Sequence, residues 1–128
     1  MNDLSDRLLK FAIDTIIFLR KLPYSEEMKI IKRQLIKSST SSGANYEEAQ
    51  GGSSKADFKN KVFISLKEMR ESNYWLKVVE GISEKKDINV SLKKLISESE
   101  ELKNILGSIV TKVSKKQTKQ SKKNLGTL

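Results

Sequence analysis

The residues of this chain best placed to do chemistry lie in two short patterns that contain carboxylates. Asn45 and Glu48 lie three residues apart, and so do Glu68 and Glu71. If both segments are helical, the members of each pair share a helix face. Carboxylates that face each other across a helical bundle would be the start of a di-metal site, which could activate water for hydrolysis.

The absence of histidine and cysteine works against such a metal site. Carboxylate metal sites in bundles typically add Glu-x-x-His motifs, and imidazole is also the commonest acid–base group near neutral pH. The chain also has no Gly-rich phosphate loop and no nucleophile elbow. We therefore expect no enzyme, no metal and no cofactor, and interpret the polar pairs as hydrogen-bonding groups that fix helix register or contact a neighbouring subunit.

The strongest charge signal is a lysine run at the C-terminus. The net charge is +9, but residues 1–111 hold 19 basic and 16 acidic groups, and the rest of the chain has six lysines and no acidic residue. Such a run could bind nucleic-acid phosphates or could only keep a tail solvated, and the sequence leaves both open. The candidate nucleic-acid-binding residues are Lys112, Lys115, Lys116, Lys119, Lys122 and Lys123.

Three aromatic residues could extend a nucleic-acid site. Tyr46, Tyr74 and Trp75 could stack on the bases of a single strand. Aromatic residues at helical spacing more often pack in a core or anchor an interface, and we prefer that interpretation.

Length and composition set the frame for these residues. A chain of 128 residues with 37% hydrophobic and 32% charged residues is typical of one soluble α-rich domain. No apolar stretch is long enough to span a membrane. The first ten residues include Asp3, Asp6 and Arg7, where a signal peptide would need an apolar run. We therefore expect a cytoplasmic protein with no membrane partner.

The first expected helix runs from about residue 3 to residue 22, because Pro23 cannot continue it. Its apolar residues form two neighbouring stripes, so the apolar arc is wider than one intramolecular face needs. The surplus indicates a subunit interface; the alternative is that this helix is simply the most buried one.

The second expected helix begins after Ser25 as N-cap and continues to about Gln50. The small residues at positions 38–44 would locally favour a loop, because serine and glycine are poor helix formers. The competing interpretation is a continuous helix, since small residues on the inward stripe allow two helices to approach closely. We prefer it mainly because of the resemblance described below.

Two longer helices complete the chain. One is expected over residues 55–80 with Ser54 as N-cap, and the other follows a polar loop at 83–87 and an Asn89 cap. Four helices with short connections predict an all-α, antiparallel up-down-up-down four-helix bundle. We place the bundle domain at residues 1–113 and a disordered basic tail at 114–128.

Residues 34–79 carry a family resemblance. This segment resembles the bacterial proteins encoded within intervening sequences of 23S ribosomal RNA genes, and the resemblance implies an antiparallel four-helix bundle that assembles as a homopentamer. It is also similar to the accessory protein of diversity-generating retroelements, a basic pentamer that works with a reverse transcriptase. The matching residues are Ser38, Gly43, Ala44, Asn45, Glu48, Ala49, Ser54, Asp57, Phe58, Lys67, Glu68, Glu71, Tyr74, Trp75 and Leu76.

These observations predict a homopentameric scaffold that binds RNA or DNA through electrostatic contacts, as an accessory to a nucleic-acid enzyme such as a reverse transcriptase. The alternative is a protein–protein interaction or structural module without nucleic-acid binding, in which the lysines serve solubility. The family-motif residues are expected to serve structure or a subunit interface in either case.

Overall fold

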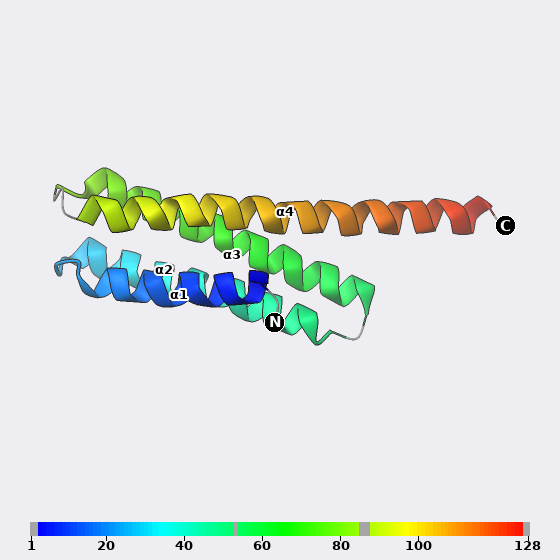
Figure 1. Cartoon of the computed structure of the whole chain (residues 1–128), viewed down its shortest axis with the longest axis horizontal. Helices are drawn as coiled ribbons and strands as arrows, with labels where there is room; N and C mark the ends of the chain where they lie inside the picture. The colour runs from blue at the N-terminus through cyan, green and yellow to red at the C-terminus, as the bar shows by residue number, and fades with distance from the viewer. Residues whose placement is uncertain (1–2, 53, 85–87, 127–128) are drawn as a thin grey trace.

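The computed structural model shows four helices that run alternately up and down (Figure 1). It describes residues 3–52, 54–84 and 88–126, with side chains up to residue 116. The predicted all-α antiparallel four-helix bundle is confirmed. Its helices are α1 (Asp3–Arg20), α2 (Glu26–Gln50), α3 (Lys55–Ile82) and α4 (Asn89–Gly126).

Local sequence explains where the helices begin. The Ser25 hydroxyl accepts a hydrogen bond from the Met28 backbone N–H at 3.0 Å, and Ser54 accepts one from the Asp57 N–H at 3.0 Å, so both predicted N-caps are confirmed. Asn89 is already the first residue of α4, so its prediction as the cap was wrong by one position or more. Residues 85–87 of the predicted loop lie outside the described residues.

The small-residue segment 38–44 is helical, which confirms the continuous α2 over the loop alternative. Its serines join α2 to α3, the two helices in most extensive contact. Ser42 Oγ donates to the Ser65 carbonyl at 2.9 Å, and Ser65 Oγ donates to the Ser42 carbonyl at 2.7 Å. Ser38 and Ser72 share a hydrogen bond of 2.8 Å between their Oγ atoms. These four buried residues form a serine seam that holds α2 close to α3.

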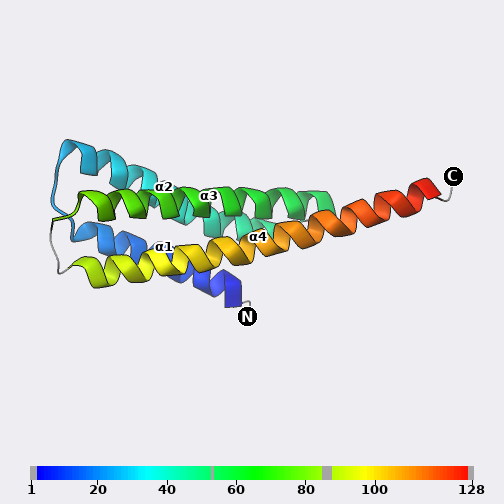
Figure 2. The same ribbon diagram turned by 90° about the horizontal axis from the view of Figure 1, so that it is seen from above.

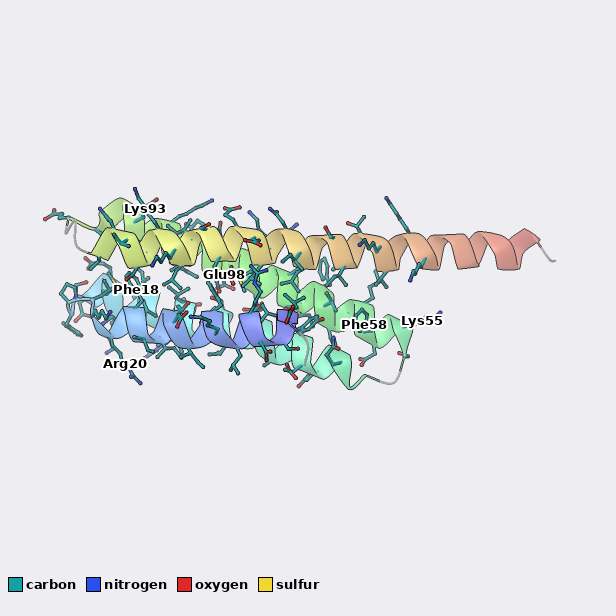
Figure 3. The ribbon with its side chains drawn as sticks, in the orientation of Figure 1. Phe18, Arg20, Lys55, Phe58, Lys93 and Glu98 are labelled. Carbon is teal, nitrogen blue, oxygen red and sulfur yellow. The ribbon has the colours of Figure 1, made fainter. Side chains whose placement is uncertain are left out.

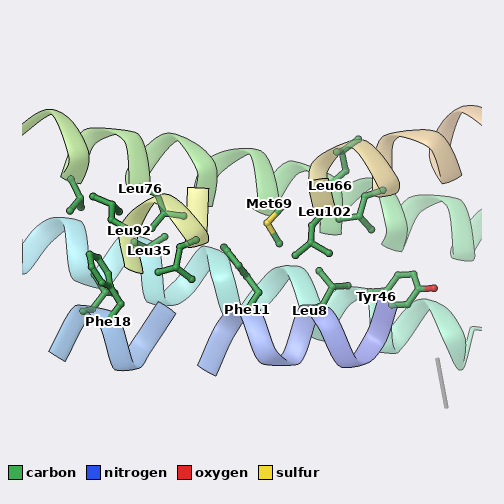
Figure 4. Close-up of a cluster of buried hydrophobic side chains, with 14 of the residues drawn as sticks. Leu8, Phe11, Phe18, Leu35, Tyr46, Leu66, Met69, Leu76, Leu92 and Leu102 are labelled. Carbon is green, nitrogen blue, oxygen red and sulfur yellow. The ribbon is translucent and has the colours of Figure 1, made fainter. Parts of the chain in front are cut away.

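A single hydrophobic core fills the space between the helices (Figure 4). Every helix contributes to it, and the close-up shows the side chains meeting between the ribbons. One buried hydroxyl in this core, Thr15 Oγ1, has no hydrogen-bond partner within the described part of the chain. The largest completely buried side chains include Leu8, Phe11, Leu19, Leu35, Met69, Leu76, Leu92, Leu102 and Leu106.

The apolar arc of α1 is only partly covered by the other helices. Leu8, Phe11 and the residues in register with them are buried, whereas Leu9, Ile13 and Ile17 are 60%, 48% and 44% exposed. The last three follow one another at intervals of four residues, so they form a stripe along one face, the α1 stripe. Within the single chain, α1 thus has both a buried face and an exposed apolar one, and both interpretations of its wide apolar arc stay open.

The last helix is much longer than the first. With 18 residues α1 is about 27 Å long, and with 38 residues α4 is about 57 Å long. Figure 2 shows the end of α4 projecting beyond the other helices. Among the side chains that the structure describes, the last apolar residue of α4 packed against the core is Val110. The backbone beyond it continues as helix to Gly126, since no proline interrupts the Lys- and Gln-rich run.

Replacing Ser65 by Ala should lower the free energy of unfolding by about 1–2 kcal/mol, because it removes a buried hydroxyl that donates across the helix pair. Replacing it by Leu should cost about 3 kcal/mol, since the larger side chain forces α2 and α3 apart. Urea unfolding followed by circular dichroism at one fixed protein concentration measures both changes.

Thr40→Ala is the matched control, because the exposed Thr40 hydroxyl donates only to carbonyls of its own helix. It should change the free energy of unfolding by less than about 0.5 kcal/mol. An equal loss for Ser65→Ala and Thr40→Ala would contradict a stabilising role for the serine seam.

Candidate nucleic-acid interface

A groove of about 900 Å³ opens between α3 and α4. Among the described side chains, four cationic ones line it, Arg70 from α3 and Lys103, Lys112 and Lys115 from α4, and no acidic one does. The other described lining residues are uncharged and include the aromatic Phe63. One-sided charge of this kind in a concave surface concentrates anions, so the basic groove is the candidate binding site.

The groove is open because α1 stops short of it. The Arg7 guanidinium of α1 makes two hydrogen bonds to Glu98 of α4, at 2.7 and 3.1 Å, and its Nη2 lies 3.2 Å from a Glu101 carboxylate oxygen. These carboxylates raise the pKa of Arg7. Figure 3 shows Glu98 on the side of α4 that faces α1. Because α1 begins at Asp3, only one turn before Arg7, it leaves α4 where the groove begins.

Ion pairs hold one of the four groove cations. Lys103 lies 2.9 Å from a Glu100 carboxylate oxygen, and Lys77 lies 2.9 Å from the other. The two ammonium groups lower the pKa of Glu100 to about 2. Across the described residues, no ion pair engages Arg70, Lys112 or Lys115, so these three charges remain for an anion.

The structure brings together two of the six predicted lysines. Lys112 and Lys115 line the groove, and Lys116 is exposed on α4 outside its lining. The backbone at 119, 122 and 123 belongs to α4, but the side chains of Lys119, Lys122 and Lys123 lie outside the described part of the chain.

Asn45 and Glu48 make separate contacts. The Asn45 amide donates to the Ser41 carbonyl of its own helix at 2.9 Å, and Glu48 forms an ion pair of 2.9 Å with Lys61 of α3. Hydrogen bonding and charge attraction from Glu48 raise the pKa of Lys61. The Glu48–Lys61 ion pair therefore adds one more link between α2 and α3.

Glu68 and Glu71 also differ from each other in environment. Glu71 accepts a hydrogen bond of 3.2 Å from the Trp75 indole N–H. Glu68 is half-buried, and burial together with the Glu71 charge raises its pKa. No group of three or more metal-ligating side chains occurs among the residues the structure describes. The contact seen for Glu71 is thus a link along its own helix.

The other motif residues lie at helix contacts or on the surface. Gly43 lies where α2 packs on α1: a Cβ atom added there would lie 3.5 Å from the Leu8 Cβ, an ordinary van der Waals contact. Phe58 packs against the core, Asp57 is half-buried in the first turn of α3, and Ala44 is exposed.

The three predicted aromatics have different surroundings. Tyr46 is buried in the core and cannot stack on a base. Trp75 packs against the core, and its ring lies 5.3 Å from the exposed Tyr74 ring at an interplanar angle of 77°. This edge-to-face pair lies away from the lining of the basic groove.

Sequence analysis missed Phe63 and Arg70 as site residues. They lie seven residues apart on α3 and so share a face, one position away from the inward Val62 and Met69. This offset was visible in the sequence, but only the packing of α4 beside that face makes it a groove.

Fold and site together define a class: a four-helix bundle with a basic groove at the end where its last helix projects. The chain belongs to the 23S rRNA-intervening sequence protein family, whose model matches residues 3–108, as its sequence resemblance predicted. No helix in the described residues is long and apolar enough to cross a membrane.

A solved structure supports the assignment. A protein with unknown function from the S23 ribosomal protein family of Bacteroides thetaiotaomicron is 30% identical to this chain, with a TM-score of 0.72. The match covers 84% of this chain and 97% of that one. Among curated proteins, none is similar enough to this chain to match it.

Stability should decrease as the pH falls from about 4.5 towards 2, in part because Glu100 becomes protonated. The pKa of Glu100 is lower in the folded protein than in the unfolded chain. Its contribution to stability is therefore present above the pKa of the unfolded state and is lost as the pH falls through the pKa of the folded state. Glu100→Gln should therefore lower the free energy of unfolding at pH 7 by less than about 1 kcal/mol, since the ion pairs of Glu100 with Lys77 and Lys103 are open to solvent. Melting temperatures of the two proteins should converge towards pH 2.

Glu80→Gln is the control, since Glu80 is exposed on α3 without an ion pair in the described part of the chain. Its melting temperature should follow that of the unchanged protein at every pH. If Glu100→Gln did the same, the ion pairs with Lys77 and Lys103 would contribute nothing to stability.

Proposed function

We propose that this protein is an oligomeric, non-catalytic scaffold that binds RNA or DNA through electrostatic contacts. The observation that carries the proposal is the basic groove, where Arg70, Lys112 and Lys115 face one concavity without an acidic lining residue. Nucleic-acid phosphates are the regular polyanion that such a cluster fits, and released counterions add to the affinity.

Assembly into a homopentamer is part of the same proposal. The α1 stripe leaves Leu9, Ile13 and Ile17 exposed on one helix face, and burying them against a second copy would remove apolar surface from water. Five chains would present five basic grooves, and linked grooves bind one strand more tightly than a single groove does. The pentamer itself rests on the family resemblance.

The names of the related proteins leave both RNA and DNA open as the partner. The family name refers to 23S rRNA intervening sequences, and the Bacteroides protein is described as a protein with unknown function from a ribosomal protein family. A shared fold does not carry a function by itself, so the role as an accessory to a nucleic-acid enzyme, such as a reverse transcriptase, rests on the basic groove and on the resemblance.

A protein–protein interaction module is the second candidate function. The exposed α1 stripe favours it, because an apolar helix face can bind another protein as well as a second copy. Only the first proposal requires salt-sensitive binding of nucleic acid.

Replacing Lys112 and Lys115 together by Gln should weaken nucleic-acid binding roughly 5- to 30-fold, because the change removes two charge interactions of about 0.5–1 kcal/mol each. Fluorescence anisotropy with labelled RNA and DNA strands, at low and physiological salt, measures the change. The slope of binding against salt should also become shallower by about 0.7 for each phosphate of a single strand that the variant no longer neutralises.

The matched control removes two lysines elsewhere, through Lys29→Gln with Lys93→Gln. Both are exposed, and Figure 3 places Lys93 at the end of α4 away from the groove. The control should bind almost as well as the unchanged protein, because its charges lie beyond the Debye length of about 8 Å. No binding by the unchanged protein at low salt would rule out the proposed function.

Ile13→Glu should break the assembly while leaving the helices folded, because it places a charge on the α1 stripe. Light scattering after size-exclusion chromatography should show the mass falling from a multiple of 14.5 kDa towards 14.5 kDa. Val90→Glu changes another exposed apolar residue, outside the stripe, and should leave the mass unchanged. An unchanged mass for Ile13→Glu would contradict the α1 stripe as subunit interface.

A further inference from the structure

Phe63 is an aromatic side chain whose position the core does not explain. It is 46% exposed and does not belong to the core cluster, unlike Phe58 on the same helix, which packs against it. It lies in the lining of the basic groove together with Arg70 and Lys112. An exposed aromatic ring in a cationic groove is the arrangement that proteins use to hold unpaired bases.

We infer that the basic groove takes a single-stranded nucleic acid, with one base stacked on Phe63 and phosphates on Arg70, Lys112 and Lys115. This inference rests on the proposed nucleic-acid binding and adds the form of the ligand and its mode of contact. In a duplex the bases already stack on one another, so their faces are closed to a protein ring. An unpaired base offers its face to Phe63.

The length and the polar lining of the groove suit a strand. The lining of α4 extends from Lys103 to Lys115, about 18 Å of helix, which is long enough for several phosphates. Asn104 and Ser108 are exposed in the lining, four residues apart on one helix face. Amide and hydroxyl groups can reach the edges of a base whose face is stacked nearby.

Gly107 provides a way to close the groove without disturbing the fold. It lies inside α4 and lines the groove, its φ angle is not positive, and a Cβ atom added there would meet nothing within 4 Å. A side chain at this position therefore extends into space that the strand would occupy. A carboxylate there would also repel phosphates.

The test uses the full chain and a labelled oligo-uridine or oligo-thymidine of about 12 nucleotides, compared with duplexes of the same length. Both single strands should bind more tightly than the duplexes. Phe63→Leu should raise the Kd for the single strands roughly 5- to 100-fold, the value of one stacked base, with the salt slope unchanged. Phe63→Tyr keeps an aromatic face and should bind within about twofold of the unchanged protein.

Gly107→Glu should weaken single-strand binding at least as strongly as Phe63→Leu, whereas Gly107→Ala should leave it unchanged and keep the helix content. The mass of each variant in solution is measured alongside. A lower mass for Phe63→Leu would make Phe63 a subunit contact and overturn the inference.

The outcomes separate the two proposals. If neither single strands nor duplexes bind the unchanged protein at low salt, the proposed function fails, and this inference fails with it. If the protein binds nucleic acid but prefers duplexes, or tolerates Phe63→Leu and Gly107→Glu, the inference alone is overturned. Weaker binding of single strands by both variants, with Gly107→Ala and Phe63→Tyr unaffected, supports it.

Discussion

The close contact of α2 and α3 is the constraint on which the rest of the bundle depends. Ser42 and Ser65 each donate to the other's backbone carbonyl, which is possible only where two helices approach closely. Larger side chains at these positions would separate the helices, and apolar ones of similar size would leave the hydroxyl contacts unmade. The α2–α3 pair is thereby fixed in register, and α1 and α4 pack their buried apolar faces against it.

The unequal helix lengths then create the candidate binding surface. Arg7 ties the beginning of α1 to Glu98 and Glu101, so α4 continues past α1 with α3 beside it. There Glu100 forms an ion pair with Lys103, while the described lining of the groove has no acidic residue beside Arg70, Lys112 and Lys115. The same geometry leaves the outer face of α1 bare. A basic groove and an apolar stripe thus follow from one arrangement of helices.

Much of this architecture could be predicted because its causes are local. Pro23, the Ser25 and Ser54 caps and the apolar periodicity place the beginnings of all four helices and the ends of the first three within a few residues of where they lie. Two segments depend on more than local propensity. Serine propensity alone would make 38–44 a loop, and the continuous helix agrees instead with the family resemblance and with the contact that this segment makes with α3. The backbone beyond Val113 stays helical because the preceding turns continue into residues that do not break a helix.

The sequence by itself determined the number of helices, the approximate beginnings of all four and the ends of the first three, the surplus apolar surface of α1 and the lysine-rich end, since each is a property of one segment and its neighbours in the chain. Only the tertiary structure decided which charges meet. Arg70 lies 42 positions from Lys112, and no local sequence pattern relates the two residues. The packing of α4 beside α3 nevertheless places both in one groove with Phe63. Long-range proximity depends on which helix faces pack together, and that choice depends on the whole core at once.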